Sequence, residues 1–280
     1  MNYRHAFHAG NFADVFKHAV LTRVLLHLHG KEAAFRAIDT HAGIGRYDLA
    51  GETPNRTGEW RNGIAKLLEN PPSGEAASLL APYLDLIRAQ NEGGKLRHYP
   101  GSPAIMQAFC RPQDRMQFCE LHPEDFATLR QNLRDPRASI TEIDGWTALK
   151  AYLPPKERRG LVLVDPAFEE PGEFHRLADG LAEAHRRWAT GVFILWYPIK
   201  DRDEVDRFER RMAGLQIAKV LRAELSVGTL PKPEALHASG LMLINPPWRL
   251  EDELKILLPA LRTALAANRD AHYRLDWIAR

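Results

Sequence analysis

Hydrophobic positions first fall into a regular pattern between Phe12 and Gly30. Apolar residues recur there at steps of three and four, the spacing that places them on one face of a helix. Asn11 stands where a helix N-cap residue is expected, and Gly30 can end the helix. The pattern predicts one helix over nearly the whole segment.

Short apolar runs of strand length follow one another along the rest of the chain. Helix-like patterns separate most of them, as in the segment that carries Leu177, Leu181 and Trp188. Such alternation predicts an α/β fold in which helices cover both faces of a mostly parallel sheet. Seven strands are expected, at 34–39, 116–120, 139–143, 161–165, 191–196, 219–227 and 240–245.

A longer gap interrupts this alternation after the first strand. About 75 residues precede the second strand, far more than a strand–helix crossover needs. Apolar residues in the gap form two amphipathic patterns, at 64–68 and 79–87, on either side of a Pro- and Gly-containing segment. We therefore expect a main domain of residues 1–51 and 96–280 with a small helical insertion at 52–95.

The composition limits the class of protein. The chain has 280 residues, of which 45% are hydrophobic and 26% charged, which excludes intrinsic disorder and allows one large α/β domain. No apolar run approaches the roughly 20 residues that span a bilayer, and the N-terminus lacks the apolar core of a secretory signal. Two cysteines, Cys110 and Cys119, cannot form a disulfide scaffold. We expect a cytoplasmic protein without membrane association.

Charge and histidine spacing argue against two further kinds of site. The formal net charge is +2, so the chain is not a simple polycationic nucleic-acid binder, although this balance permits a local basic patch. His27 and His29 would point about 200° apart on a helix and could not share a metal ion. No acidic residue lies at a recognisable metal-ligand interval from the histidines. We therefore expect no metal.

Candidate chemistry lies where the predicted strands end, because open parallel sheets bind ligands at that edge. Gly43 and Gly45 follow the first strand and permit a tight turn, but they form neither a dinucleotide fingerprint nor a phosphate-binding loop. Glu120 ends the second strand, and its carboxylate suits two ribose hydroxyls; Asp144 follows the third and could accept from an adenine amino group. Singly, these residues are explained as well by turns and helix caps. Together they predict a site for an adenosine-containing cofactor.

The fourth strand is followed by Asp165-Pro166-Ala167-Phe168. This placement resembles the catalytic motif of the class I S-adenosylmethionine-dependent adenine-N6 methyltransferases, whose pattern is Asp/Asn/Ser-Pro-Pro-aromatic. The exocyclic amine of adenine is a weak nucleophile because its lone pair is delocalised into the ring. A carboxylate and a backbone carbonyl that accept its two hydrogens direct that lone pair toward the methyl group, while an aromatic ring stacks on the base.

Other segments make the resemblance more specific. They are residues 3–11 with Asp14, Lys17 and His18, and residues 39–43, 99–103, 120–123 and 196–198. Over the whole chain, the sequence resembles the ribosomal RNA large-subunit methyltransferase J family. The resemblance implies a Rossmann-like class I methyltransferase with S-adenosyl-L-methionine as its cofactor. It also implies methylation of the N6 amino group of adenine 2030 in 23S rRNA, before full ribosome assembly, by a monomer without an obligate protein partner.

The resemblance also implies a role for particular residues. Asp165 is expected to be the catalytic acceptor and to contact the cofactor as well. The segment before the first helix is expected to act as a flap over the target base. The remaining cofactor contacts are expected at His18, His41, Ser102, Glu120, Asp144 and Gly145, and the substrate contacts at Tyr3, His5, Lys17, Pro166 and Phe168.

Ala167 departs from the family pattern, because it stands where the second proline is expected. Pro166 and its carbonyl remain, so both hydrogen-bond acceptors survive, while the fixed φ of the second proline is lost. We expect a slower or looser site that still works. Two alternatives stay open: a DNA adenine-N6 methyltransferase, and a non-catalytic nucleic-acid-binding relative.

A second motif, Asn245-Pro246-Pro247-Trp248, matches the pattern more fully and also follows an apolar strand. It ends the seventh strand, which we expect to lie too far along the sheet from the Gly43 loop. A methyl donor at that place would have no glycine loop beside it. We therefore interpret this motif as a structural turn that leads into the last helix.

Overall fold

The computed structural model describes residues 5–230 and 235–280. No helix among these residues is long and apolar enough to cross a membrane. The α-helices of this part of the chain are α1 (Phe12–Leu28), α2 (Glu52–Thr57), α3 (Ile64–Glu69), α4 (Gly74–Ala89), α5 (Ser102–Phe109), α6 (Pro123–Asn132), α7 (Gly145–Ala151), α8 (Glu173–Arg187), α9 (Arg202–Gly214) and α10 (Leu250–Leu265). Two 3-10 helices, η1 (His5–Phe7) and η2 (Glu59–Arg61), accompany them.

The strands form one large sheet and one two-stranded ribbon. The large sheet has the order β10-β8-β9-β7-β6-β1-β4-β5, and the ribbon pairs β2 with β3. The strands are β1 (Arg36–Asp39), β2 (Arg46–Asp48), β3 (His98–Pro100), β4 (Arg115–Glu120), β5 (Ala138–Glu142), β6 (Gly160–Val164), β7 (Val192–Pro198), β8 (Val220–Ser226), β9 (Ala238–Ile244) and β10 (His272–Ala279).

The mostly parallel sheet of the predicted α/β fold is confirmed. Strands β5, β4, β1, β6 and β7 pair in parallel, whereas β9 runs antiparallel to both β7 and β8. Strand β1 lies between β4 and β6, with Asp39 in register with Phe118 and Leu163. The carboxyl ends of these three strands therefore meet at one edge, which we call the catalytic edge.

The large sheet has eight strands, one more than the seven expected. The additional strand, β10, pairs antiparallel with β8 and places Tyr273 opposite Leu225. Its first three residues are exposed and the other residues of the strand are half-buried, so the segment contains no buried apolar run. An ion pair between Asp276 and Arg222 of β8 joins the two strands at 2.5 Å. The sequence pattern missed β10 because pairing with a distant partner, rather than burial, defines it.

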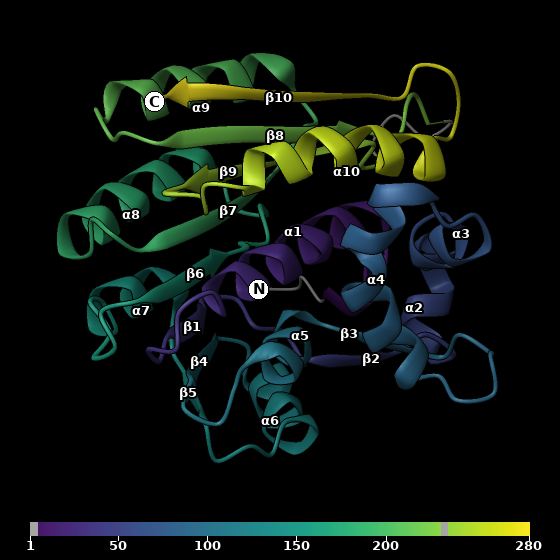
Figure 1. The fold of residues 1–280 in the computed structure, drawn as a ribbon, viewed down its shortest axis with the longest axis horizontal. Coiled ribbons are helices and arrows are strands. Elements are labelled where there is room, and N and C mark those ends of the chain that lie inside the picture. Colours follow the sequence, from purple (N-terminus) through teal and green to yellow (C-terminus); the bar gives the residue numbers. More distant parts are fainter. Residues whose placement is uncertain (1–4, 231–234) are drawn as a thin grey trace.

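Helices cover both faces of the sheet, as predicted. One hydrophobic cluster joins the sheet to α1, α5, α6 and α10, and a second joins it to α7, α8 and α9. Helix α1 begins as expected, because the Asn11 side chain accepts a hydrogen bond from the Asp14 backbone N–H at 2.9 Å. It ends at Leu28, with His29 as the C-cap, two residues before Gly30. In Figure 1, α1 and α10 lie together with α4 in front of the sheet.

The insertion contains the two amphipathic helices that its pattern predicted, α3 and α4. Ribbon β2–β3 brings the ends of this segment together, with Tyr47 opposite Tyr99. Buried residues of the insertion, including Leu67 and Tyr83, share one core with α1 and α10. The backbone N–H of Ile64 also donates to the Gly10 carbonyl at 2.9 Å. The insertion is thereby anchored on the segment that starts α1 (Figure 1).

Candidate active site

A partly open cavity lies at the catalytic edge. Five of the predicted cofactor residues line it: His18, His41, Ser102, Glu120 and Asp165. Asp144 and Gly145 line an adjoining hollow that shares His41 and Glu120 with this cavity. The fold therefore brings the predicted cofactor residues together, although they come from six separate parts of the chain.

Glu120 is held in place by two backbone groups. Its carboxylate accepts from the N–H of Gly43 and from the N–H of His122, both at 2.8 Å. Gly43 has φ = 59°, and a Cβ at this residue would lie 2.5 Å from the Tyr47 hydroxyl, so the turn needs glycine. Burial raises the pKa of Glu120, against the lowering effect of these N–H donors. Its position suits the acceptance of two hydroxyl donors from inside the cavity.

Asp144 and Gly145 join the first turn of α7 to the loop after β1. Asp144 is the N-cap of α7, since its carboxylate accepts from the backbone N–H of Thr147 at 2.8 Å. A Cβ at Gly145 would lie 2.6 Å from the His41 ring, so only glycine allows this close approach. Burial lowers the pKa of His41 to about 4. His41 is therefore neutral near pH 7.

Asp39 is a buried carboxyl group that the sequence did not single out. One of its oxygens accepts from the His41 backbone N–H at 3.1 Å, and the other has no well-formed hydrogen bond among the described residues. Burial raises the pKa of Asp39 to about 7, although the nearby Ser102 hydroxyl opposes this shift. A carboxyl group in this state is poised to take up a cationic or hydrogen-bond-donating partner. Its place at the end of β1 was the available signal.

Four charged side chains form a buried network that ends at Asp165. Lys17 contacts the Asp14 carboxylate at 2.8 Å and also donates to Asp165. His5 lies 3.0 Å from Asp14, which further accepts from the Gly10 backbone N–H at 2.9 Å. Asp14 and Lys17 are only 2% and 3% exposed. Of the predicted substrate residues, Lys17 thus contacts the predicted catalytic carboxylate of Asp165 directly, and His5 is linked to Lys17 through Asp14. The sequence pointed to Asp14 only as part of a motif.

The charges of this network stabilise one another. Burial alone would raise the pKa of Asp14, but the positive charges of His5 and Lys17 outweigh it and hold that pKa well below its usual range. Burial likewise opposes the charge on Lys17, yet Asp14 and Asp165 raise the pKa of Lys17 above its ordinary value. Lys17 is therefore a permanent cation beside Asp165.

His18 links the cavity to the insertion. Its Nδ1 lies 2.8 Å from the Tyr99 hydroxyl, which in turn lies 2.9 Å from the hydroxyl of Tyr83 on α4. Burial lowers the pKa of His18 to about 3, so the ring is neutral and works as a hydrogen-bonding group. The predicted cofactor residue is thereby oriented by β3 and α4.

A second, partly open cavity adjoins the first. The two share a wall made of His5, Lys17, Asp165 and Ala167. Phe168 lines the second cavity but not the first. Its backbone has φ = 53°, and the centre of its ring lies 5.8 Å from that of Trp196. Pro166 is buried directly after Asp165. Of the predicted substrate residues, only Tyr3 lies outside the described residues.

Asn245 lies at the opposite edge of the sheet. Strand β9 is three places from β1, which precedes the Gly43 loop, so distance along the sheet does not by itself separate the motif from that loop. The direction of β9 decides instead, because an antiparallel strand ends where its neighbours begin. The Asn245 side-chain amide donates to the backbone carbonyls of Ala189 and Gly191 at 2.8 and 2.9 Å. Asn245 therefore holds a turn, as predicted.

Known proteins resemble this chain over nearly its whole length. A family model described as "Ribosomal RNA large subunit methyltransferase D, RlmJ" matches residues 32–279. The ribosomal RNA large subunit methyltransferase J of Escherichia coli (strain K12) is 40% identical over 279 residues, which cover 99% of each chain. The protein of the same name from Haemophilus influenzae is also 40% identical, over 280 residues and 99% of each chain. The chain belongs to the RlmJ family.

A solved structure matches this RlmJ-family chain closely. The crystal structure of protein LPL1258 from Legionella pneumophila superposes with a TM-score of 0.87 at 34% identity, covering 96% of this chain and 98% of that one. A probable spermidine synthase from Corynebacterium glutamicum, 14% identical with a TM-score of 0.51, shares the fold alone. The class I methyltransferase fold that the resemblance implied is confirmed.

Proposed function

We propose that this RlmJ-family chain transfers a methyl group from S-adenosyl-L-methionine to the N6 amino group of one adenine in 23S rRNA, adenine 2030. One observation carries the proposal: Asp165 lies in the wall between two adjoining cavities. A methyl donor in one cavity and a base in the other would both reach this carboxylate. The names of the two relatives at 40% identity support ribosomal RNA of the large subunit as the substrate.

The chemistry of the first cavity fits the cofactor. Glu120 suits the ribose hydroxyls, Asp144 suits the adenine amino group, and Ser102 and His18 offer further polar contacts. When bound, the cofactor supplies an electrophilic methyl group on a positively charged sulfur.

Lys17, Asp165 and the residues that follow Asp165 would activate and hold the target base. Asp165 accepts one hydrogen of the adenine amine and the Pro166 carbonyl accepts the other, which frees the nitrogen lone pair for attack. Lys17 donates to the Asp165 carboxylate and fixes its orientation. Phe168 stacks on the base and holds it out of its helix. Because Lys17 and Asp14 are buried, this arrangement exists before substrate binds and needs little rearrangement.

The proposal extends to how RNA reaches the site. The insertion at 52–95 borders the second cavity, since Glu59 contacts both His8 and Asn11 of its lining at 3.0 Å. We assign the insertion to holding RNA and the segment before α1 to a flap over the base. An RNA strand that enters this cavity has to be accessible. This favours action by a monomer in the cytoplasm before ribosome assembly is complete.

Methyl transfer from labelled S-adenosyl-L-methionine tests the proposal. Protein-free 23S rRNA and duplex DNA serve as the two substrates, and digestion to nucleosides identifies the methylated position. We expect N6-methyladenosine in the RNA and no label in the DNA. Label in DNA alone would replace this function with DNA methylation. Cofactor binding by calorimetry without transfer to either nucleic acid would mark a non-catalytic relative.

A further inference from the structure

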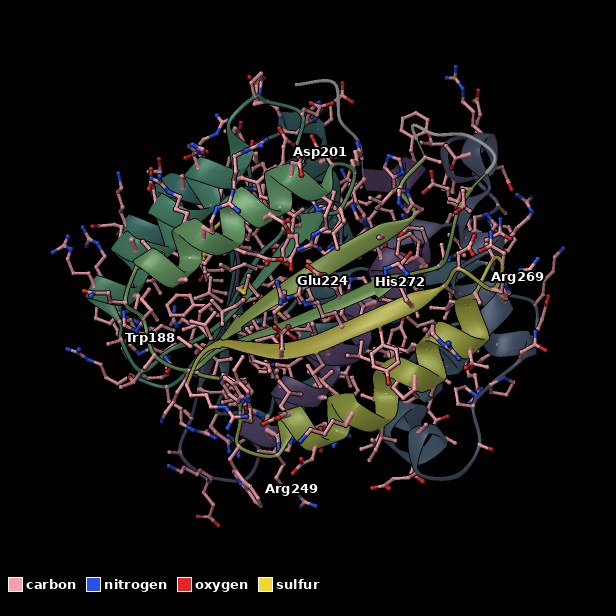
Figure 2. The ribbon with its side chains drawn as sticks, turned by 90° about the horizontal axis from the view of Figure 1, so that it is seen from above. Trp188, Asp201, Glu224, Arg249, Arg269 and His272 are labelled. Carbon is pink, nitrogen blue, oxygen red and sulfur yellow. The ribbon has the colours of Figure 1, made fainter. Side chains whose placement is uncertain are left out.

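The edge of the sheet opposite the catalytic edge carries an exposed aromatic side chain beside unpaired positive charges. Trp248 is 84% exposed, and the guanidinium of Arg249 lies 5.5 Å from the centre of its ring. We call this surface, made of Lys31, Arg115, Arg158, Lys219, Trp248 and Arg249, the far-edge patch. Figure 2 shows Arg249 and Trp188 toward one end of the strands and Asp201 toward the other.

The topology places these residues along one edge. Arg115 starts β4, Arg158 precedes β6, and Lys219 precedes β8, while Trp248 follows the reversed strand β9. The Asn245 backbone N–H donates to the Lys219 carbonyl at 3.0 Å, which joins the turn to β8. Neighbouring strands lie about 4.8 Å apart, so the five steps from β8 to β4 extend over roughly 24 Å.

Positive charge in the patch is not neutralised by the protein. Lys31, Arg115, Arg158 and Lys219 are exposed and form no ion pair with any residue that the structure describes. Three carboxylates close to this edge are already paired, Asp114 with Arg111, Glu157 with Arg36, and Glu253 with Arg23. Glu32, next to Lys31, is exposed and forms no ion pair with the described residues. The patch therefore presents free cations with little competing negative charge.

A single-stranded nucleic acid fits this combination better than a protein does. Protein interfaces surround their aromatic anchors with other apolar side chains, whereas the other exposed large hydrophobic residues of the described chain, Leu121 and Tyr273, lie after β4 at the catalytic edge and on β10. An isolated ring flanked by arginine and lysine is typical of surfaces on which bases stack while cations meet phosphates.

We propose that the far-edge patch is a second RNA-binding surface, on which Trp248 stacks an unpaired base of the RNA substrate and the surrounding cations contact its phosphates. The proposal rests on the proposed function, because it takes the same RNA as the partner. Strands of five to seven residues separate the two edges by roughly 17–23 Å. A folded RNA that places its adenine at Asp165 can extend around the molecule to this patch.

RNA affinity tests the second surface. Trp248→Ala, Trp248→Phe and the double variant Lys31→Ala/Arg158→Ala are compared with wild type, and Tyr273→Ala serves as the matched exposed-aromatic control. Filter binding at several salt concentrations uses protein-free 23S rRNA and a short stem-loop that contains only the target adenine. Calorimetry with S-adenosyl-L-methionine and kcat for methyl transfer report on the catalytic edge.

We expect Trp248→Ala to weaken binding of the long RNA about fivefold or more, since stacking contributes at least about 1 kcal/mol per base. Trp248→Phe should recover most of this loss, and Tyr273→Ala should bind as wild type does. The double variant should lower the salt slope by about 1–2. Binding of the stem-loop, cofactor affinity and kcat should not change.

Two results would overturn this surface without touching the proposed function. The first is unchanged long-RNA affinity and salt slope in the variants while the wild type methylates 23S rRNA, which would leave a protein partner as the explanation for Trp248. The second is an equal loss with the stem-loop, which would indicate a structural effect. A wild type that methylates no RNA would instead refute the proposed function.

Discussion

Two segments of this chain have almost the same composition and opposite surroundings. Asp165-Pro166-Ala167-Phe168 follows a parallel strand. The Asp165 carboxylate accepts a hydrogen bond from the buried Lys17 and lies in the wall between two cavities. Asn245-Pro246-Pro247-Trp248 follows an antiparallel strand. The Asn245 side-chain amide donates to two backbone carbonyls, and Trp248 faces solvent. The segment that matches the sequence pattern more fully, Asn245 to Trp248, lines neither of the two cavities.

The difference teaches that such a motif acquires its chemistry from the edge of the sheet at which it ends. Asp165 follows β6, which pairs with β1, and lies at the edge where Glu120 and the Gly43 turn lie. Asn245 ends beside the starts of β7 and β8, where its amide can only close a turn. Strand direction therefore separates a candidate catalytic group from a structural one.

The largest expected contrast comes from removing the two polar side chains. Asp165→Ala deletes the acceptor for the amine hydrogen and should lower single-turnover methyl transfer to 23S rRNA by about 10²–10⁴-fold. Asn245→Ala should leave transfer nearly unchanged and lower the melting temperature, since two side-chain hydrogen bonds are lost, one of them exposed and the other partly buried. An active Asp165→Ala protein together with an inactive Asn245→Ala protein would reverse the assignment of the site.

Glu120 sharpens the contrast, because a cofactor residue lies beside only one of the motifs. Glu120→Ala should weaken S-adenosyl-L-methionine binding by roughly 1.5–3 kcal/mol, the contribution of hydrogen bonds to a charged acceptor. Calorimetric titration of the folded variant measures this loss. Glu251 provides the control, because it is a partly exposed acid in the first turn of α10, close to the other motif. Glu251→Ala should bind the cofactor as wild type does. Equal affinities in the two variants would remove Glu120 from the site.

His5 and Asp14 belong to the network that contacts Asp165, so the pH dependence of stability tests this network. Burial opposes protonation of His5, but Asp14 outweighs it and raises the pKa of His5 above 6.5. The pair therefore stabilises the fold fully below pH 6.5 and loses this effect as pH rises through the raised pKa, while Asp14, with its lowered pKa, remains ionised above pH 3.8.

We expect the melting temperature of wild type to exceed that of His5→Gln most between about pH 4 and 6.5. The two curves should converge at higher pH. His98→Gln, at an exposed position on β3, should run parallel to wild type throughout. A His5→Gln difference that is independent of pH would mean that packing, rather than charge, holds the segment before α1.

The smallest expected effect comes from making the two motifs alike. The Ala167 backbone N–H donates no hydrogen bond to the described residues, so Ala167→Pro removes no contact and should stabilise the loop by about 0.4–1 kcal/mol. Methyl transfer should be preserved or raised. The reciprocal Pro247→Ala should cost a similar amount of stability, measured by denaturant unfolding, with transfer unchanged. Loss of transfer in Ala167→Pro would show that the loop needs the alanine backbone.

Local pattern was enough to predict the main layers of the fold. The helix from Phe12, the helices of the insertion and the parallel strands all follow from the spacing of apolar residues. Strand β10 and the direction of β9 did not, because both depend on which distant strand supplies the hydrogen bonds. Periodicity records burial, and it contains no information on pairing partners.

The candidate site divides in the same way. Glu120, Asp144 and Asp165 could be found because they follow apolar runs that end at one edge. The contact between Lys17 and Asp165 spans 148 residues of sequence, so no spacing rule reveals it. Asp39 could have been chosen by the same rule as Glu120, but its burial and unsatisfied oxygen are properties of the folded chain alone.

The network of His5, Asp14, Lys17 and Asp165 also has a consequence for how this sequence can change over generations. Its members alternate in sign, so the loss of any one leaves a neighbour buried with an uncompensated charge, a change that commonly costs about 3–5 kcal/mol. Replacing Asp14 alone leaves His5 without its partner carboxylate, and replacing Lys17 alone removes the cation that lies between Asp14 and Asp165. We therefore expect substitutions at these positions to occur together, with a second change restoring the balance of charge that the first one disturbs.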